Sequence, residues 1–318
     1  MADCGAAAHA AMDSAGAISR YWQQEWRLPH CPLSIKGYSR AAYRTGFYIP
    51  ELNIMLDAGP YTVKNPAHIF ITHNHVDHVA GLPFSLFCND KSFRFQVYGP
   101  AAAEEHIRRY VGSMFELNDL IPPGEFDPAV EKYQYHGYSE ATNFRLTIKK
   151  ILYEVDVVLC DHTVPTISYC FSEIRRRLKQ EYRGKDRAEL CGLKAEGLDI
   201  MEDFKKRLFG FICDSSIAVL DTNPDILNFP VVFIECTFLY PDEIEQARKC
   251  KHIHWADLEP YVQRHPDTFF VLIHFTLRHD EATIMQFFQQ VREQTGVSNF
   301  KIWVGDTRED LPHQYPSA

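Results

Sequence analysis

Residues 73–78 read His73-Asn74-His75-Val76-Asp77-His78, and this short stretch decides the fold of the chain. Imidazole nitrogens and carboxylates are the ligands that a borderline-soft cation such as Zn²⁺ prefers. Side chains two positions apart do not share a helix face, so His73 and His75 can converge on one ion only from a strand end or a loop. The apolar run 68–72 directly upstream predicts a buried strand. A strand end that delivers three histidines and an aspartate can hold two adjacent metal ions, an arrangement suited to hydrolysis.

The bulk composition is that of a globular protein. Of 318 residues, 46% are hydrophobic and 24% are charged, and this length allows one large domain or two small ones. The chain contains no run of about eighteen apolar residues, so we expect no membrane-spanning helix. The net charge of −9 disfavours non-specific nucleic-acid binding by the whole surface, although it leaves room for a local basic patch.

The cysteines and the N-terminal segment both bear on location. The nine cysteines form no Cys-x-x-Cys pair, which favours reduced thiols in an intracellular protein over a disulfide framework. The first residues are rich in Ala, Gly and Ser and lack the apolar core of about 7–15 residues found in a signal peptide. We therefore expect a disordered tail over 1–25 and a location in the cytoplasm or nucleus, with mitochondria left open.

The remaining sequence predicts alternating strands and helices. Short strands are expected over 33–57, and two strands with a turn near Lys149 over 144–159. Further strands are expected at 166–171, 209–214, 231–235, 269–274 and 301–304, helices at 101–110 and 281–293, and a polar, partly helical segment at 172–206. Because no linker divides the chain, we predict a single α/β domain over 26–318 in which two sheets pack face to face with helices outside.

Several apolar strands end in a side chain that can bind a metal. His73, His162, Asp214 and His274 each follow such a run, and strand ends are where rigid scaffolds present chemistry. A site for two metals needs about seven ligands, one of them a bridging carboxylate. The sequence supplies that number: His73, His75, Asp77, His78, His162, Asp214 and His274.

These elements resemble the metallo-β-lactamase superfamily and, within it, the short-form ribonucleases Z, which process the 3′ ends of tRNA. The signature His-x-His-x-Asp-His at 73–78 is shared with many other hydrolases. More specific segments follow in the family's order at 161–169, 211–215, 234–238, 252–254 and 274–279. Ser168, Cys213, Ser215 and His279 depart from the family's usual residues. The resemblance extends from about Ile35 to Arg278.

The resemblance implies a four-layer αβ/βα sandwich and two Zn²⁺ ions per subunit. His73, His75 and His162 would hold one ion, Asp77, His78 and His274 the other, and Asp214 would bridge them. A hydroxide between the two ions would attack phosphorus and leave a 3′-hydroxyl and a 5′-phosphate. Asp77 would orient or deprotonate the attacking water. Asp57 would orient a ligand histidine from behind, as carboxylates commonly do.

Other residues are candidates for proton transfer and RNA contact. Glu235 and His252 are candidates for protonating the leaving group, because a buried glutamate holds a histidine in one tautomer and raises its pKa. His254 is an alternative acid or a phosphate contact. Arg278 is either a phosphate contact or a structural ion-pair partner.

A basic stretch lies between His162 and Asp214. Residues 171–210 hold eleven basic and eight acidic side chains, a balance of +3, and Arg175, Arg176 and Arg177 form its densest basic spot. Phosphate contacts supply most of the non-specific affinity for RNA. The resemblance implies a short arm here that grips precursor tRNA, and a homodimer in which each arm serves the site of the other subunit.

The leading hypothesis is therefore a zinc-dependent endoribonuclease that removes the 3′ trailer from precursor tRNA. One alternative is a hydrolase of the same fold that acts on another phosphodiester or on a thioester. The other is a binding protein that has kept the fold without catalysis. The presence of all seven candidate ligands disfavours that last alternative.

Overall fold

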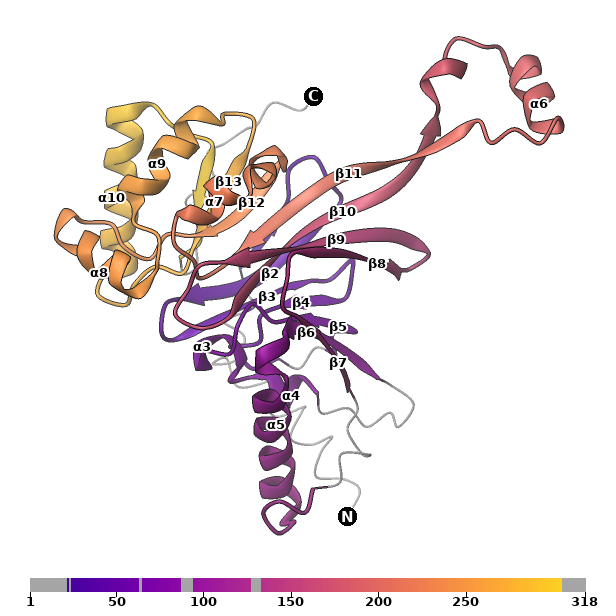
Figure 1. Cartoon of the computed structure of the whole chain (residues 1–318). Helices are drawn as coiled ribbons and strands as arrows, with labels where there is room; N and C mark the ends of the chain where they lie inside the picture. The colour runs from indigo at the N-terminus through magenta and orange to yellow at the C-terminus, as the bar shows by residue number, and fades with distance from the viewer. Residues whose placement is uncertain (1–21, 23, 63–64, 87–93, 127–132, 305–318) are drawn as a thin grey trace.

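The computed structural model describes residues 22, 24–62, 65–86, 94–126 and 133–304, which form two seven-stranded sheets packed face to face (Figure 1). The first sheet is built in chain order from β1 (Glu25–Arg27), β2 (Ser34–Arg40), β3 (Arg44–Ile49), β4 (Ile54–Leu56), β5 (His68–Phe70), β6 (Phe95–Pro100) and β7 (Tyr133–Tyr138). Pairing is antiparallel from β1 to β4 and parallel from β4 to β7.

The second sheet repeats this plan. Its members are β8 (Thr142–Ile148), β9 (Ile151–Cys160), β10 (Thr166–Leu178), β11 (Met201–Ile212), β12 (Val231–Glu235), β13 (Phe269–Ile273) and β14 (Phe300–Ile302). The strands from β8 to β11 are antiparallel and those from β11 to β14 are parallel. The turn predicted near Lys149 is confirmed, and both Lys149 and Lys150 adopt positive φ there.

Helices cover the outer face of each sheet, which gives the predicted four-layer αβ/βα sandwich (Figure 1). The first sheet carries α3 (Val76–Val79), α4 (Leu82–Ser85), η1 (Ala101–Ala103) and α5 (Glu104–Asp119). The second carries α7 (Ala218–Thr222), η4 (Pro224–Asn228), η5 (Pro241–Glu243), α8 (Ile244–Cys250), α9 (Trp255–Arg264) and α10 (Glu281–Thr295). The helices predicted at 101–110 and 281–293 are confirmed, and both extend further than expected.

The main core lies between the two sheets and is aromatic at its centre. The ring centroid of Phe47 lies 5.8 Å from those of Phe211 and Phe233 and 5.3 Å from that of Trp303. The indole Nε1 of Trp303 donates to the carbonyl of Gly37 at 3.0 Å, which ties the last strand to the first sheet. Two further apolar clusters lie under the helices on the outer faces. Such packing holds the strand ends rigid.

An arm projects from the second sheet (Figure 1). The segment 172–206 was expected to be partly helical, and η3 (Gln180–Tyr182) and α6 (Arg187–Ala195) at the far end of the arm confirm this. The rest of the arm was not predicted, because β10 and β11 stay paired from Glu173 with Lys206 out to Leu178 with Met201. The register shifts between Phe171 and Ser172, and such bulges bend a strand away from its sheet.

Three other expectations concern the ends, the thiols and the membrane. The predicted tail over 1–25 lies outside the described residues except at 22, 24 and 25, and Glu25 already belongs to β1. The seven cysteines in the described part of the chain are all free thiols. Across those same residues, every helix is too short or too polar to cross a bilayer.

Candidate metal centre and active site

The predicted ligands meet where strands of both sheets end. The segment after β5 carries His73, His75, Asp77 and His78, while His162 follows β9, Asp214 follows β11 and His274 follows β13. The last residues of β5, β11 and β13 are apolar and buried, so the polar side chains that follow them lie at the sheet edge. The structure brings all seven side chains together.

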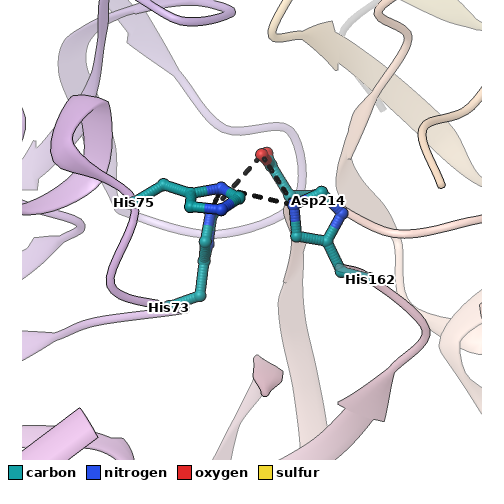
Figure 2. Close-up of side chains that lie close together, drawn as sticks. All are labelled: His73, His75, His162 and Asp214. Atoms are coloured by element: carbon teal, nitrogen blue, oxygen red, sulfur yellow. Dashed lines mark hydrogen bonds and ion pairs between the residues drawn. The ribbon is translucent and has the colours of Figure 1, made fainter. Parts of the chain in front are cut away.

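The first group consists of His73, His75, His162 and Asp214 (Figure 2). Nδ1 of His75 lies 3.0 Å from Nε2 of His73 and 3.4 Å from Nε2 of His162. Oδ2 of Asp214 lies 3.5 Å from Nε2 of His73 and 3.8 Å from Nε2 of His162. Figure 2 shows the three rings and the carboxylate pointing at one another, with His73 and His75 on one loop and His162 and Asp214 on other segments.

The second group consists of Asp77, His78 and His274, again with Asp214 beside it. Nε2 of His78 and Nε2 of His274 lie 3.3 Å apart, and each is 3.5 Å from Oδ2 of Asp77. The two oxygens of Asp214 divide between the groups, because Oδ1 lies 3.3 Å from His274 while Oδ2 faces His73, His78 and His162. The carboxylate of Asp214 therefore borders both groups.

Partners behind the rings fix which nitrogen faces inward. Nδ1 of His78 donates to Oδ2 of Asp57 at 2.9 Å, and Nδ1 of His162 donates to the carbonyl of Lys251 at 3.2 Å. A carboxylate and a carbonyl accept hydrogen bonds only, so both rings carry their proton on Nδ1 and present a lone pair on Nε2.

Two buried threonines also fix which nitrogen carries the proton, in the rings of His73 and His274. The Thr72 hydroxyl donates to Asp57, so at 3.0 Å it accepts from Nδ1 of His73. The Thr237 hydroxyl donates to Oε2 of Glu235 at 2.6 Å, so at 3.2 Å it accepts from Nδ1 of His274. Neither threonine was predicted as part of the site. The only sequence signal was a hydroxyl residue beside a ligand or within the Glu-x-Thr element.

The donor set fits divalent cations. Five imidazole rings and two carboxylates face one another, and their lone pairs and negative charges repel unless positive charge lies among them. Four ligand atoms around a zinc-sized ion in a tetrahedron are roughly 3.3 Å apart. The separations within the two groups, 3.0–3.8 Å, bracket that spacing. We conclude that the chemistry and spacing of these residues suit a pair of metal ions.

The electrostatics of the cluster lead to the same conclusion. Burial alone would raise the pKa of Asp214, but the imidazoles of His274, His78 and His73 hold this pKa well below its usual range. Burial likewise lowers the pKa of His78, yet the carboxylates of Asp214 and Asp57 raise it well above the usual value. Without a cation, a second proton on His78 thus balances part of the carboxylate charge, and a cation bound among these groups would take the place of that proton.

The backbone around the site is strained at three places. Asp57, Lys251 and His274 adopt positive φ angles of 54°, 55° and 65° without being glycine. Such residues persist only where the surrounding structure holds them, and they concentrate at functional sites. These residues supply the Asp57 carboxylate that accepts from His78, the Lys251 carbonyl that accepts from His162, and the His274 ring itself.

Glu235 and His252 lie directly beside the ligands. Oε1 of Glu235 accepts from Nδ1 of His252 at 2.9 Å and from the amide of Ser215 at 2.6 Å, while Oε2 accepts from the amide of Ile253 at 3.1 Å. Burial lowers the pKa of His252, but the carboxylate of Glu235 outweighs this and raises the pKa to about 9. A cation in the adjacent cluster would lower it again. His252 thus keeps a defined tautomer, with Nε2 available to another molecule.

A cavity of about 530 Å³ opens over these residues, which is large enough for a nucleotide-sized ligand. Its lining combines the cluster with a loop of the first sheet: Ala42, Tyr43, Arg44, His75, Val76, Asp77, Asp214, His252 and His274.

Comparison with known proteins agrees with this geometry. The chain is 28% identical over 252 residues to "tRNase Z TRZ1" of Arabidopsis thaliana, a match that covers 77% of this chain and 86% of that protein. It is 25% identical over 270 residues to "tRNase Z TRZ2, chloroplastic" of the same plant, covering 80% and 70%. No protein-family model matches the chain.

Among solved structures, the metallo-beta-lactamase fold protein YhfI from Bacillus subtilis matches with a TM-score of 0.52 at 12% identity, over 84% of this chain and 94% of that one. The chain therefore resembles ribonucleases Z in sequence over most of its length, and it has the metallo-β-lactamase fold. The family's late elements, which the sequence suggested at 234–238 and 252–254, form the Glu235–His252 pair beside the cluster.

Several predicted site residues lie away from the cluster of seven ligand-type side chains. His254 is buried and acts as the N-cap of α9: Nδ1 accepts from the amide of Ala256 at 3.1 Å, and Nε2 donates to the carbonyl of Tyr240 at 2.9 Å. Both ring nitrogens of His254 are thus used inside the fold, and we do not carry it forward as an acid or RNA contact. Arg278 lies 3.9 Å from Glu243 and stacks over Phe238, which favours the structural alternative.

The three arginines of the basic spot lie on β10 in the arm, and each is paired with an acidic side chain. Arg175 contacts Glu173 at 2.7 Å, while Arg176 contacts Asp199 and Arg177 contacts Glu202, both at 2.8 Å. The arginine side chains are 42–55% exposed, and exposed pairs contribute only about 0–1 kcal/mol. Little free energy is therefore lost when the three arginines leave these acidic side chains to contact RNA phosphates.

Arg40 was not predicted and supports the loop after His274. Its buried guanidinium donates to the carbonyls of Phe275 at 3.2 Å, Thr276 at 2.8 Å and His279. The Ala41 amide adds a bond to the Phe275 carbonyl at 3.1 Å. Because these segments lie at least 234 residues apart in the sequence, no local pattern could have indicated the contact.

Proposed function

We propose that this chain is a metal-dependent endoribonuclease that removes the 3′ trailer from precursor tRNA. The observation that carries the proposal is the convergence of seven ligand-type side chains beside the Glu235–His252 pair, in a chain whose curated relatives are named tRNase Z. The cluster alone would support many hydrolases, and the adjacent acid pair with those relatives favours the nuclease.

His73, His75 and His162 would hold one cation, Asp77, His78 and His274 the other, and Asp214 would border both. Divalent cations bound there would supply charge neutralisation for a phosphoryl group and a water acidified enough to react near neutral pH. We propose Zn²⁺, two ions per subunit, because imidazole-rich donor sets favour zinc over magnesium or calcium. Metal analysis of the purified protein tests both the identity and the number.

The residues of the chain have separable tasks in the reaction. The carboxylate of Asp77 is the least enclosed of the ligands on its side, with its side chain 12% exposed, and it lines the cavity, so it can orient the attacking water. His252 also lines the cavity, with its Nδ1 proton held by Glu235. A second proton on Nε2 of His252 can pass to the departing 3′ oxygen, which makes this histidine the general acid.

We assign the arm to the body of the tRNA. Folded tRNA is recognised largely through its backbone and shape, and the arm presents Arg175, Arg176 and Arg177 on an extended hairpin. A homodimer would let the arm of one subunit serve the site of its partner, and light scattering of the purified protein tests that part. A location in the cytoplasm or nucleus stays a prediction, to be tested by imaging a tagged chain.

The test is incubation of the purified protein with a 3′-extended precursor tRNA, followed by mapping of both new ends. The proposal predicts a cut at or next to the discriminator base that leaves a 3′-hydroxyl and a 5′-phosphate. If the metal-loaded protein leaves this RNA intact but hydrolyses a cyclic nucleotide or a thioester, the proposal fails and the alternative substrate classes replace it.

A further inference from the structure

A row of planar side chains leads from the cavity onto the surface. Tyr43 and Arg44 line the cavity itself. The guanidinium carbon of Arg44 lies 5.9 Å from the ring centroid of Tyr43 and 5.7 Å from that of Tyr61. The ring of Tyr61 in turn lies 4.4 Å from that of Phe84, at an interplanar angle of 60°. The row thus joins the metal cluster to two aromatic rings outside it.

Close backbone packing fixes the outer part of the row to the ligand segment. A Cβ on Gly59 would lie 1.9 Å from the carbonyl oxygen of Asp77, and a Cβ on Gly81 would lie 2.4 Å from that of Pro60. The Ala58 amide also donates to the His78 carbonyl at 2.7 Å. Tyr61 follows this packed segment directly, and Phe84 lies on α4 just beyond Gly81. Their rings therefore sit at a set position relative to Asp77 and His78.

The rings are not used to build the core. Tyr61 is 38% exposed and Phe84 is 37% exposed, although Leu82 and Leu86 on the same short helix are 0% and 1% exposed. The hydrogen bond from Trp22 Nε1 goes to the backbone carbonyl of Tyr61, so the tyrosine ring is not needed for it. Aromatic rings that are more than one-third exposed beside a polar cavity suit a ligand that is itself flat and apolar on its faces.

The positive charge of Arg44 beside the tyrosine rings indicates which class of flat ligand fits this surface. Arg44 places a cation between two tyrosines in a chain whose net charge is −9. Flat rings joined by anionic groups are the pattern of a single-stranded nucleic acid, whose bases stack on aromatic and guanidinium planes. A peptide or a lipid would meet the apolar faces without matching both the cation and the phosphodiester chemistry of the cavity.

We propose that Tyr61 and Phe84 form a stacking platform for one unpaired base of the RNA, next to the scissile phosphate. This inference rests on the proposed function and deepens it, because it assigns recognition of the cleavage site to base stacking as well as to the arm. Every base has a stacking face, so the platform selects for an unpaired nucleotide and tolerates any sequence.

The experiment is a cycle of protein and RNA changes on the full-length, metal-loaded protein. The double variant Tyr61→Ala/Phe84→Ala is compared with the wild type on a 3′-extended precursor tRNA. It is then compared on versions of that RNA with a single abasic nucleotide at each position flanking the cut. Loss of one stacked base predicts a fall in kcat/KM of about 5- to 100-fold for the double variant on intact RNA.

At one abasic position, the wild type and the double variant should become equal, because the base that stacks is already missing. The aromatic exchange Tyr61→Phe/Phe84→Tyr should retain activity on intact RNA. Leu117→Ala serves as the matched control, since it removes a 70% exposed apolar side chain from α5. Metal content and thermal unfolding of each variant separate loss of stacking from loss of fold.

Unchanged kcat/KM in the double variant, or an equal loss on every abasic RNA, would overturn the platform while leaving the nuclease intact. Failure of the wild type to cleave the precursor would instead refute the proposed function, and the platform with it.

Discussion

Replacing Asp57 by asparagine should weaken metal binding at the cluster without removing any ligand. Oδ1 of Asp57 accepts from the Thr72 amide at 2.7 Å, and Oδ2 accepts from Nδ1 of His78 at 2.9 Å. The backbone N–H of Thr72 can only donate, so an asparagine must keep its oxygen there and turn its NH₂ toward His78. His78 must then accept on Nδ1 and carry its proton on Nε2, where the lone pair for the cation is needed.

The size of the effect follows from the role of such supporting carboxylates. Their loss typically weakens metal binding about 10–100-fold, which corresponds to about 1.4–2.7 kcal/mol. Asp57 also supports His73 through Thr72, so both groups of ligands should weaken. The assay is a competitive metal titration of the chelator-treated variant, with cleavage of precursor tRNA measured in parallel.

Glu243→Gln is the matched control. Glu243 is a buried carboxylate that accepts from the amides of Leu239 and Tyr240 and contacts His279, but it touches none of the seven ligands. It should lower the melting temperature and leave metal affinity unchanged. Wild-type affinity in Asp57→Asn, or an equal loss of affinity in Glu243→Gln, would refute the tautomer argument.

Three other substitutions test separate parts of the account. His252→Ala should slow RNA cleavage about 10²–10⁴-fold, the usual contribution of a general acid, but slow a nitrophenyl phosphodiester much less because its leaving group needs no proton. Equal slowing in both rate assays would remove His252 as the acid. Changing Arg175, Arg176 and Arg177 together to Ala should weaken precursor tRNA binding and flatten its salt dependence while sparing a small phosphodiester. Parallel losses on both substrates would contradict the arm assignment. Arg40→Met should leave buried carbonyls unpaired, at about 1–3 kcal/mol each, and lower the melting temperature; an unchanged melting curve would show that the loop after His274 does not need Arg40.

The sequence predicted which side chains gather at the site, because each of them is marked by a local pattern. An apolar strand ends and a histidine or aspartate follows within a few residues, directly at His274 and after Asp161 at His162. The sandwich followed from the same strands and from the family resemblance. What a single strand cannot indicate is its partner, so the antiparallel and parallel halves of each sheet emerged only in the structure.

The supporting residues could not be predicted, because their roles arise between distant segments. The hydroxyls of Thr72 and Thr237 accept hydrogen bonds from ligand-type histidines. Arg40 donates to carbonyls more than two hundred residues away in the sequence. The role of His254 could not be predicted for a related reason. It lies two residues after His252 in the His-x-His element, but α9 begins directly after it and its side chain caps that helix.

The extension of β10 and β11 into the arm was not predicted because these strands lack the pattern on which strand prediction depends. Beyond the bulge at Ser172 most residues of β10 and β11 are charged, and none up to Arg207 is buried. Alternation of polar and apolar residues reports one buried face, and a hairpin that extends into solvent has none. Cross-strand ion pairs such as Arg177 with Glu202 link the two strands instead.

The most direct test of the central claim is single-turnover cleavage of a 3′-extended precursor tRNA by three preparations: the metal-loaded protein, the same protein after chelation, and metal-loaded Asp77→Ala. The account predicts cutting beside the discriminator base by the first, recovery of the second when Zn²⁺ is returned, and no cutting by the third although it still binds the RNA. Cleavage that survives chelation, or that Asp77→Ala retains, would contradict a metal-dependent nuclease built on this cluster.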